Sequence, residues 1–282
     1  MSVANPALPL ASVPRWKNLN RWQAFAIHFA LSALVFAILV ALMVVWWFPG
    51  ELFLFDGGWQ GLKLVAIVDL VLGPALTLVL WNPKKPSLVF DICVVAAFQI
   101  AALAYGFVTT YDQRTVAMVF TESTFVSLSN AEHREASEIL LEKEITPVAL
   151  SEFESGHPTL VLTPSPDMYS FGQYLEDLFN GYPEARERND LYINLADGRD
   201  SMKESALDQA ALEELGWDKA VQQEVITKGF DETTLEFYKF ETRYAKGIAI
   251  FDATSIDSID YLPLDSVPAE TKPTISVESL VD

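Results

Sequence analysis

Cysteine is almost absent from this sequence, since Cys93 is the single example in 282 residues. A chain with one cysteine cannot form an intramolecular disulfide in any compartment. Cys93 stands among Ile, Val and Ala in a long apolar run, where a thiol acts as a small apolar side chain. The sequence therefore predicts neither a disulfide framework nor a redox role.

Histidine is also scarce, and the few histidines do not form a metal-binding or catalytic pattern. His133 and His157 are 24 residues apart without a neighbouring cysteine, and no H-E-x-x-H or G-x-S-x-G spacing occurs. The acids Asp252, Asp257 and Asp260 lack the glycine and terminal glutamate of a calcium-binding loop. We therefore predict a protein that is not an enzyme, with no metal and no cofactor.

Basic residues are few in relation to acidic ones, and they are unevenly placed. The chain has 19 Lys and Arg against 38 Asp and Glu, a formal net charge of −19. Residues 1–108 have a formal charge of +2, whereas residues 109–282 have −21. Because nucleic-acid binding depends on Lys and Arg at the phosphates, this balance predicts that nucleic acid is not a partner.

Long apolar runs, in contrast, are present three times, at about residues 24–48, 62–81 and 88–108. Each has the ~20 residues with which a helix crosses the hydrocarbon core of a bilayer. A cleaved signal peptide is the competing interpretation of the first run. That run is too long for the apolar core of a signal peptide and no small-residue cleavage pattern follows it, so we predict a retained anchor.

The positive charges around these runs predict an orientation in the membrane. Residues 1–23 and the short loop 82–87 contain Lys and Arg, whereas the loop 49–61 contains none. By the positive-inside rule, the arm 1–23 and the loop 82–87 lie in the cytoplasm. The acidic region 109–267 is then periplasmic, and tryptophans flank the spans as interfacial belts do.

Residues 109–267 have the pattern of a soluble α+β domain. Alternating Val, Phe and Thr predict strands, and acidic, alanine-rich stretches predict helices. The expected strands are 115–120, 124–128, 160–162, 235–244, 247–251 and 259–262, and the expected helices are 131–142, 167–180, 201–215 and 218–227. The predicted fold is thus a three-helix transmembrane bundle followed by an extracytoplasmic α+β domain and a flexible tail, 268–282.

Polar side chains occur inside the predicted spans at two depths. At 1.5 Å per residue, His28, Thr77 and Asp91 lie ~5–6 Å inside the cytoplasmic edge, and Asp69 and Gln99 lie ~16–18 Å inside it. An aspartate near the bilayer centre costs at least ~2.5 kcal/mol, so Asp69 is expected to face a partner such as Gln99. Three interpretations stay open: polar contacts that hold the bundle together, a contact for a partner helix, or an ion or proton relay.

Small residues and one proline predict how the spans pack. Gly73-Pro74 follows Asp69 by one turn, and Pro74 is expected to kink the second span. On the third span, Ala97 and Ala101, and then Ala102 and Gly106, have the small-xxx-small spacing that lets another membrane helix approach closely.

The membrane half resembles a known bacterial family, the type IV pilin accessory proteins (the TfpX/TfpZ family). The motifs that carry the resemblance follow one another through about residues 21–128. They are residues 21–25 with His28, 55–61, 63–64, 68–74, 76–78, Asn82, Lys85, Asp91, Gln99, 102–103, 105–106, 113–114, Ala117 and 119–120. Thr115 departs from the proline expected there, and the resemblance does not extend beyond residue 128.

The resemblance implies an inner-membrane chaperone of a Gram-negative bacterium. Such a protein binds and stabilises its cognate type IV pilin and promotes or modulates pilus assembly and retraction. The implied partners are the lipid bilayer and the membrane helix and head of the major pilin. Asp56-Gly57-Gly58-Trp59 then forms a tight turn at the outer interface, either as a pilin contact or as a plain interfacial turn with Trp59 as its anchor.

Two other classes of function remain as alternatives. In the first alternative, the chain is an extracytoplasmic sensor. In the second, it is a small-solute or proton-linked membrane subunit that uses Asp69 and His28. A sensor normally needs a cytoplasmic output domain, and the predicted cytoplasmic segments are short. If the chain is a proton-linked subunit, Asp69→Asn is expected to abolish function while the abundance of the protein stays unchanged.

Overall fold

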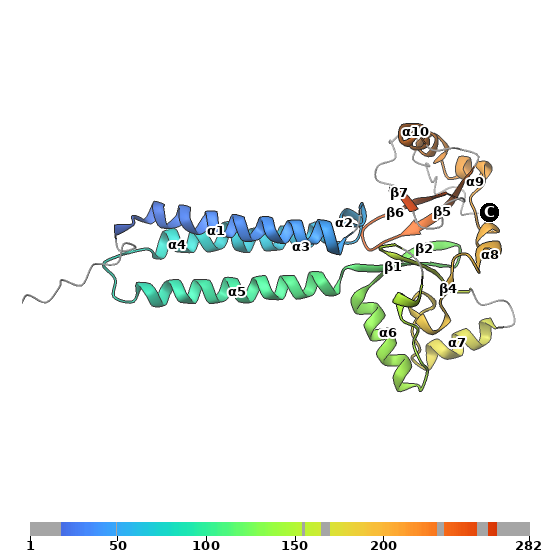
Figure 1. Cartoon of the computed structure of the whole chain (residues 1–282), viewed down its shortest axis with the longest axis horizontal. Coiled ribbons are helices and arrows are strands. Elements are labelled where there is room, and N and C mark those ends of the chain that lie inside the picture. Colours follow the sequence, from blue (N-terminus) through green and yellow to red (C-terminus); the bar gives the residue numbers. More distant parts are fainter. Residues whose placement is uncertain are drawn as a thin grey trace, which may run out of the picture. The chain divides into compact units, whose positions relative to one another are not determined.

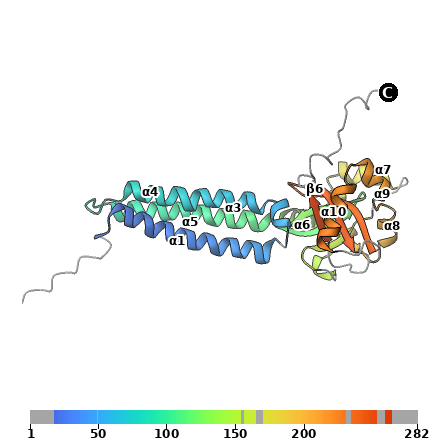
Figure 2. The same cartoon turned by 90° about the horizontal axis from the view of Figure 1, so that it is seen from above.

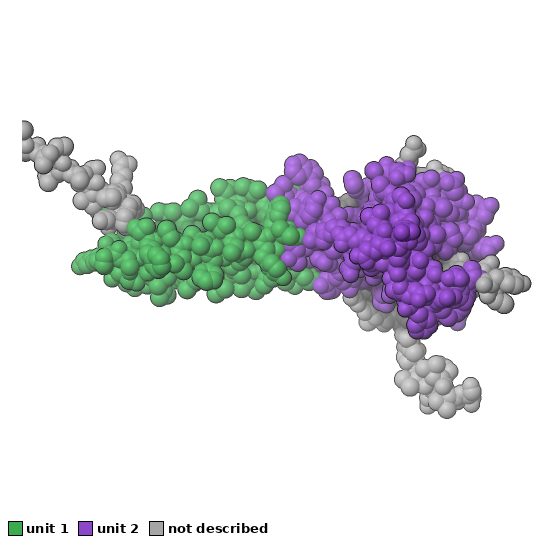
Figure 3. Space-filling model, turned by 90° about the horizontal axis from the view of Figure 1, so that it is seen from below, with its two compact units in different colours: residues 1–41, 60–108 green, residues 42–59, 109–282 purple. Residues whose placement is uncertain are grey.

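The computed structural model describes residues 18–48, 50–153, 156–164, 170–229, 234–252 and 259–263. The chain divides into two compact units, which Figure 3 shows in different colours. We call residues 1–41 and 60–108 the helix unit, and residues 42–59 and 109–282 the sheet unit. Most of the predicted N-terminal arm, Asp257 and the predicted tail 268–282 lie outside the described residues.

Three helices in the described residues are long and apolar enough to cross a membrane, as the sequence predicts. They span Arg21–Trp47, Gly58–Leu80 and Leu88–Asp112. The first consists of α1 (Arg21–Leu42) and a π-helix, Met43–Trp47. The second consists of α3 (Gly58–Ala66), a π-helix (Ile67–Leu72) and α4 (Gly73–Leu80), and the third is α5 (Leu88–Asp112). Figures 1 and 2 show the three lying side by side.

The ends of these helices follow from local sequence. The second span stops at Leu80, and Trp81 is already extended. Asn82 precedes Pro83, a position that disfavours helical backbone, so the chain turns there before α5 begins. The second span therefore ends where the sequence changes from apolar residues to a proline-containing turn.

The sheet unit contains one mixed sheet of seven strands in the order β4-β3-β1-β2-β5-β6-β7. Its strands are β1 (Thr115–Thr121), β2 (Thr124–Ser129), β3 (Thr159–Leu162), β4 (Ile193–Asn194), β5 (Leu235–Glu241), β6 (Lys246–Asp252) and β7 (Ile259–Pro263). β1 pairs parallel with β3, and β2 pairs parallel with β5. The pairs β1–β2, β3–β4, β5–β6 and β6–β7 are antiparallel.

The sheet unit also contains short helices, of which the first precedes β1 in the chain and the others connect strands. They are α2 (Leu52–Phe55), α6 (Asn130–Glu142), α7 (Phe171–Phe179), α8 (Arg199–Lys203), α9 (Gln209–Glu214) and α10 (Asp218–Lys228). The helices α9 and α10 pack on β6 and β7 in one apolar cluster, through residues such as Val221 and Ile248. This helix and mixed-sheet arrangement confirms the predicted fold class.

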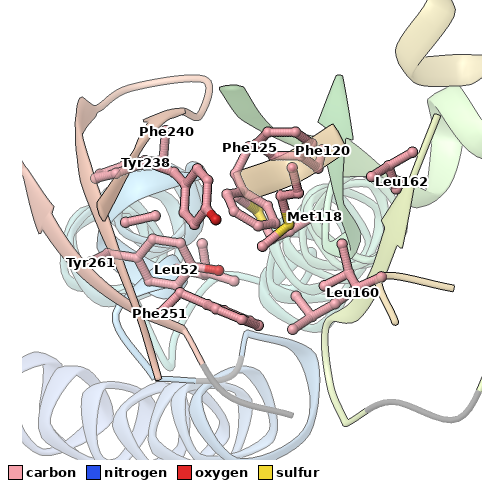
Figure 4. Packing of buried hydrophobic residues seen from close by; sticks show 13 residues of the cluster. Leu52, Met118, Phe120, Phe125, Leu160, Leu162, Tyr238, Phe240, Phe251 and Tyr261 are labelled. Atoms are coloured by element: carbon pink, nitrogen blue, oxygen red, sulfur yellow. The ribbon is translucent and has the colours of Figure 1, made fainter. Parts of the chain in front are cut away.

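Alternate residues of the strands point to opposite faces of the sheet, as strand geometry requires. On β1, Met118 and Phe120 belong to the largest apolar cluster, whereas Ala117 and Val119 belong to another. The largest cluster is rich in aromatic side chains, and Figure 4 shows Phe120, Phe125 and Tyr238 within it. Edge-on ring contacts join these three, with centroids 4.9–5.7 Å apart.

Three details differ from the sequence prediction. The helix expected over 201–215 is two helices, because Asp208 accepts a hydrogen bond from the amide of Ala211 and begins α9 anew. The helix expected over 131–142 begins one residue earlier, at Asn130, because Ser129 caps it and forms a reciprocal capping box with Glu132. The strand β4 was not expected, since two residues are too short to show an alternating pattern.

Candidate functional site

Asp69 and Gln99 meet inside the helix unit. Asp69 is 5% exposed and lies in the π-helix of the second span. The side-chain amide of Gln99, on α5, donates a hydrogen bond to Asp69 Oδ1 at 3.5 Å. The depth-matched partner expected from the sequence is therefore the one that the structure provides.

Gly73 makes room for this contact. A Cβ atom at Gly73 would lie 1.9 Å from Nε2 of Gln99, so only glycine lets the Gln99 side chain cross at this point. The Gly73 amide donates to the carbonyl of Val68, five residues earlier, as π-helical geometry requires. The π-helix directly precedes α4, in which Pro74 lies, and the kink expected at Pro74 stays a prediction.

The other intramembrane polar residues have separate partners. His28 Nδ1 lies within hydrogen-bond distance of the Thr77 hydroxyl, which joins α1 to α4. Asp91 does not share this contact and instead forms an ion pair with Lys85. The Trp81 indole donates to the Leu19 carbonyl at 3.0 Å, which fixes the same end of the helix unit.

The small residues of α5 divide between two environments. A Cβ atom at Gly106 would lie 3.1 Å from Val65, and Ala102 is half-buried, so this pair faces the second span. Ala97 and Ala101 are exposed in the described residues. One small-residue pair therefore serves the packing of the bundle, and the other is open.

The loop between the first two spans forms part of the sheet unit. Leu52 is 1% exposed and belongs to the largest apolar cluster, where Figure 4 shows it beside the strand residues. Phe55 packs against Phe240 of β5, with ring centroids 6.0 Å apart. The sequence places the soluble domain wholly after residue 108, whereas the structure adds residues 42–59 to it.

Asp56 is the centre of this loop and is 1% exposed. Its carboxylate accepts hydrogen bonds from the Thr115 hydroxyl, the Ser127 hydroxyl at 3.1 Å and the Arg243 amide at 3.0 Å. These donors come from β1, from β2 and from the turn after β5. A buried carboxylate requires such donors, and here they join the loop to three parts of the sheet.

The backbone beside Asp56 is joined to the same turn. The carbonyl of Phe55 accepts a hydrogen bond from the Thr242 hydroxyl at 2.9 Å and another from the Tyr244 amide at 3.0 Å. The sequence did not reveal these partners, because Thr242 and Arg243 each lie 187 residues along the chain from the loop residue that they contact. The local signal for a buried site was an acidic residue, Asp56, in a loop that contains no Lys or Arg.

The next two residues, Gly57 and Gly58, lie so close to aromatic rings that a side chain at either position would clash. Gly57 has a φ of +100°, and a Cβ there would lie 2.9 Å from the Tyr244 ring. A Cβ at Gly58 would lie 2.5 Å from the Phe53 ring. The tight turn expected at Asp56-Gly57-Gly58-Trp59 is thus a turn at Asp56 and Gly57 that leads directly into α3, and Trp59 is 47% exposed.

Glu51 extends the polar contacts of the loop. Burial raises the pKa of Glu51 above its ordinary value, and the nearby charge of Lys228 opposes this shift. Lys228 forms ion pairs with Glu224 at 3.2 Å and Asp260 at 2.9 Å. The loop therefore approaches α10 and β7 as well as the turn after β5.

The hydrogen bonds and ion pairs described above hold segments of the chain together. Among the described residues, no group of three or more His, Cys, Asp and Glu side chains is placed to hold a metal ion. Asp56 has its hydrogen-bond partners within the sheet unit, and Asp69 and His28 have theirs within the helix unit. Their evident chemical role is to position the spans and the sheet.

Comparison with known proteins relates the chain to fimbrial assembly proteins of Dichelobacter nodosus. It is 30% identical to that of serogroup I over 167 residues, 57% of this chain and 62% of the relative. It is 28% identical to that of serogroup E1 over 186 residues, 64% of this chain and 69% of the relative. It is 32% identical to that of serogroups C1 and C2 over 108 residues, 38% of this chain and 82% of the relative.

The match thus spans less than two thirds of the serogroup I protein. No family model matches the chain. No solved structure matches it either.

Proposed function

Because the chain belongs to the family of the fimbrial assembly proteins, we propose that it binds and stabilises its cognate type IV pilin and thereby promotes or modulates pilus assembly and retraction. The family membership is the observation that carries this proposal. It confirms the resemblance to the type IV pilin accessory proteins and supports a role in pilus biogenesis. The proposed role is that of a chaperone without catalytic activity.

The three apolar helices make the chain a membrane protein. We assign it to the inner membrane, with the N-terminus in the cytoplasm and the sheet unit in the periplasm. The distribution of Lys and Arg supports this orientation, because positive charge precedes the first span and fills the loop between the second and third.

The open small-residue pair of α5, Ala97 and Ala101, is the proposed contact for the pilin membrane helix. Small side chains let two helix backbones approach closely in lipid, where packing rather than the hydrophobic effect drives association. Ala102 and Gly106, on the neighbouring positions, already serve the bundle itself. Of the two pairs on α5, one therefore serves the packing of the bundle and the other is available to a partner.

In this proposal the sheet unit receives the pilin head while the helices hold the pilin helix. The loop at Asp56 supports this division of roles, because it joins the connection of the first two spans to the core of the sheet. The buried network at Asp56 therefore fixes this connection within the sheet unit.

Deletion of the gene in the bacterium that produces the protein tests this function. We expect fewer surface pili and less pilin, because unprotected pilin is degraded, and we expect pilin to co-purify with the full-length protein. Normal piliation together with no co-purified pilin would contradict the proposal. Complementation with the unaltered gene is the control.

A further inference from the structure

The sheet unit contains a cavity of about 530 Å³ at the end of the first span. Segments of the sheet unit form its walls: the end of the π-helix 43–47, the start of β1 with Arg114 before it, the start of α6, and residues 150–153 and 156–159. Its lining residues are Trp46, Trp47, Arg114, Thr115, Val116, Asn130, His133, Leu150, Ser151, Phe153, Gly156, His157 and Thr159.

The lining is unusual for so acidic a region. Residues 109–282 have a formal charge of −21, yet none of the described residues that line the cavity is Asp or Glu. Arg114 is the residue among them with a permanent charge. The lining also includes the apolar side chains of Trp46, Leu150 and Phe153. The cavity therefore combines one cation with an apolar wall, which suits an amphiphile with an anionic head.

Arg114 is held in place by an aromatic stack. Its guanidinium lies 3.7 Å from the centroid of the Tyr111 ring, and its Nη1 donates to the Tyr111 carbonyl at 2.8 Å. The Tyr111 ring in turn meets Trp47 edge-on, with centroids 5.4 Å apart. Because a guanidinium has five N–H donors, Arg114 retains donors for an anion while the stack fixes its position.

The nearby acid Asp112 interacts mainly with Arg134 and more weakly with Arg114. Asp112 accepts hydrogen bonds from both terminal nitrogens of Arg134, at 3.0 and 3.4 Å. His133 also lines the cavity, and burial lowers its pKa, so it contributes a neutral polar ring. Arg114 thus remains the source of positive charge in the cavity.

Residues at the ends of two membrane-spanning helices line the cavity or hold Arg114 in place. Trp46 and Trp47 are the last residues of the first membrane-spanning helix, and Tyr111 is next to last in the third. Trp and Tyr favour the layer of lipid headgroups, and Trp46 is 75% exposed. The amphiphile most abundant in that layer is phospholipid.

We propose that this cavity binds the phosphate headgroup of an anionic phospholipid at Arg114, with the adjoining acyl chain against Trp46. The proposal does not depend on the proposed pilin contact, since it uses different residues. Such a lipid fixes the sheet unit at the membrane surface, because headgroup and acyl chain then bind one cavity together.

The matched pair Ser151→Glu and Ser151→Gln tests the proposal. Ser151 is exposed and lines the cavity, so both variants are expected to fold, but only glutamate places a negative charge beside the headgroup. The full-length protein is reconstituted in nanodiscs of equimolar phosphatidylglycerol and phosphatidylcholine, and the lipid retained after transfer to detergent is counted by native mass spectrometry. We expect Ser151→Glu to reduce retained phosphatidylglycerol about tenfold and Ser151→Gln to leave it unchanged.

Variants of Arg114 complete the test. Arg114→Gln is expected to match Ser151→Glu, whereas Arg114→Lys keeps the charge and retains more lipid. Lys219→Gln removes an equal charge from an exposed position on α10 that does not line the cavity, and it is expected to have no effect. Equal retention in all variants, no preference for phosphatidylglycerol in the unaltered protein, or capture of a protein chain by a photoactivatable group at residue 151 would each overturn the proposal.

Discussion

Asp56 is the residue through which the loop between the first two spans depends on the sheet. Asp56→Ala leaves the Thr115 hydroxyl, the Ser127 hydroxyl and the Arg243 amide without their acceptor. A buried donor without a partner costs ~1–3 kcal/mol, so we expect the free energy of unfolding of the sheet unit to fall by about 3 kcal/mol. Pulse proteolysis in urea on the full-length protein in detergent measures this change.

The control for this prediction is Asp200→Ala, which removes an exposed acid from α8 of the same unit. We expect it to change the free energy of unfolding by less than about 0.5 kcal/mol. If both variants unfold at the same urea concentration as the unaltered protein, the Asp56 network does not stabilise the fold.

His133 makes the stability of the sheet unit depend on pH. Burial lowers its pKa, so the folded protein keeps this ring neutral below the pH at which an unfolded histidine, with a pKa of ~6.5, takes up a proton. The unfolded state therefore binds the proton first, and the free energy of unfolding decreases as pH falls below about 6.5. His133→Gln is expected to flatten this part of the pH profile.

Unfolding curves of the unaltered protein and of His133→Gln at a series of pH values test this expectation. The two profiles should differ in slope below neutral pH and run parallel above it. Parallel profiles over the whole range would show that His133 titrates alike in both states.

Among the elements, the second span depends on the absence of a side chain at Gly73. Gly73→Ala forces Gln99 away from its position and so removes its hydrogen bond to Asp69. Side-chain hydrogen bonds in membrane proteins contribute ~0.6–1.7 kcal/mol, and we expect a loss of this size when the protein is unfolded in mixed detergent micelles. The double variant Gly73→Ala/Gln99→Ala should be no less stable than Gln99→Ala alone.

Gly172→Ala is the matched control, because a Cβ there has open space around it in helix α7. It is expected to be neutral or slightly stabilising. A loss of stability in the double variant equal to the sum of the single losses would show that Gly73 acts independently of Gln99.

Elements with a clear local pattern could be predicted from the sequence. Strands β1 and β2 and helix α10 lie within a few residues of their expected bounds, because Val-, Phe- and Thr-rich runs and an acidic, alanine-rich stretch show them locally. The break between α8 and α9 was missed, since the acidic composition continues through it and only the Asp208 cap marks the new start.

The candidate site also has a part that could be predicted from the sequence and a part that could not. The Asp69–Gln99 contact could be predicted, because helices of known rise in a bilayer of known thickness put both residues at one depth. The partners of Asp56 could not, since Thr115, Ser127 and Arg243 reach it only when the sheet has assembled. Long-range pairing of this kind leaves no periodic signal in a single sequence.

For the whole molecule, the proposed orientation predicts which parts meet the periplasm. Alkaline phosphatase becomes active only where its disulfides form, outside the cytoplasm. Fused after Glu144, in the sheet unit, the enzyme is expected to be active, and fused after Lys84, between the second and third spans, it is expected to be inactive. The opposite result would reverse the proposed topology.

The central claim is that this protein holds a pilin helix against α5, and photocrosslinking in living cells tests it most directly. A photoactivatable residue is placed at Ala101, which is exposed, or at Ala102, which is half-buried and has Gly106 four residues beyond it. In cells that make pilin, we predict a crosslink to pilin from position 101 and far less from position 102. No pilin from either position, or equal capture from both, would contradict the claim.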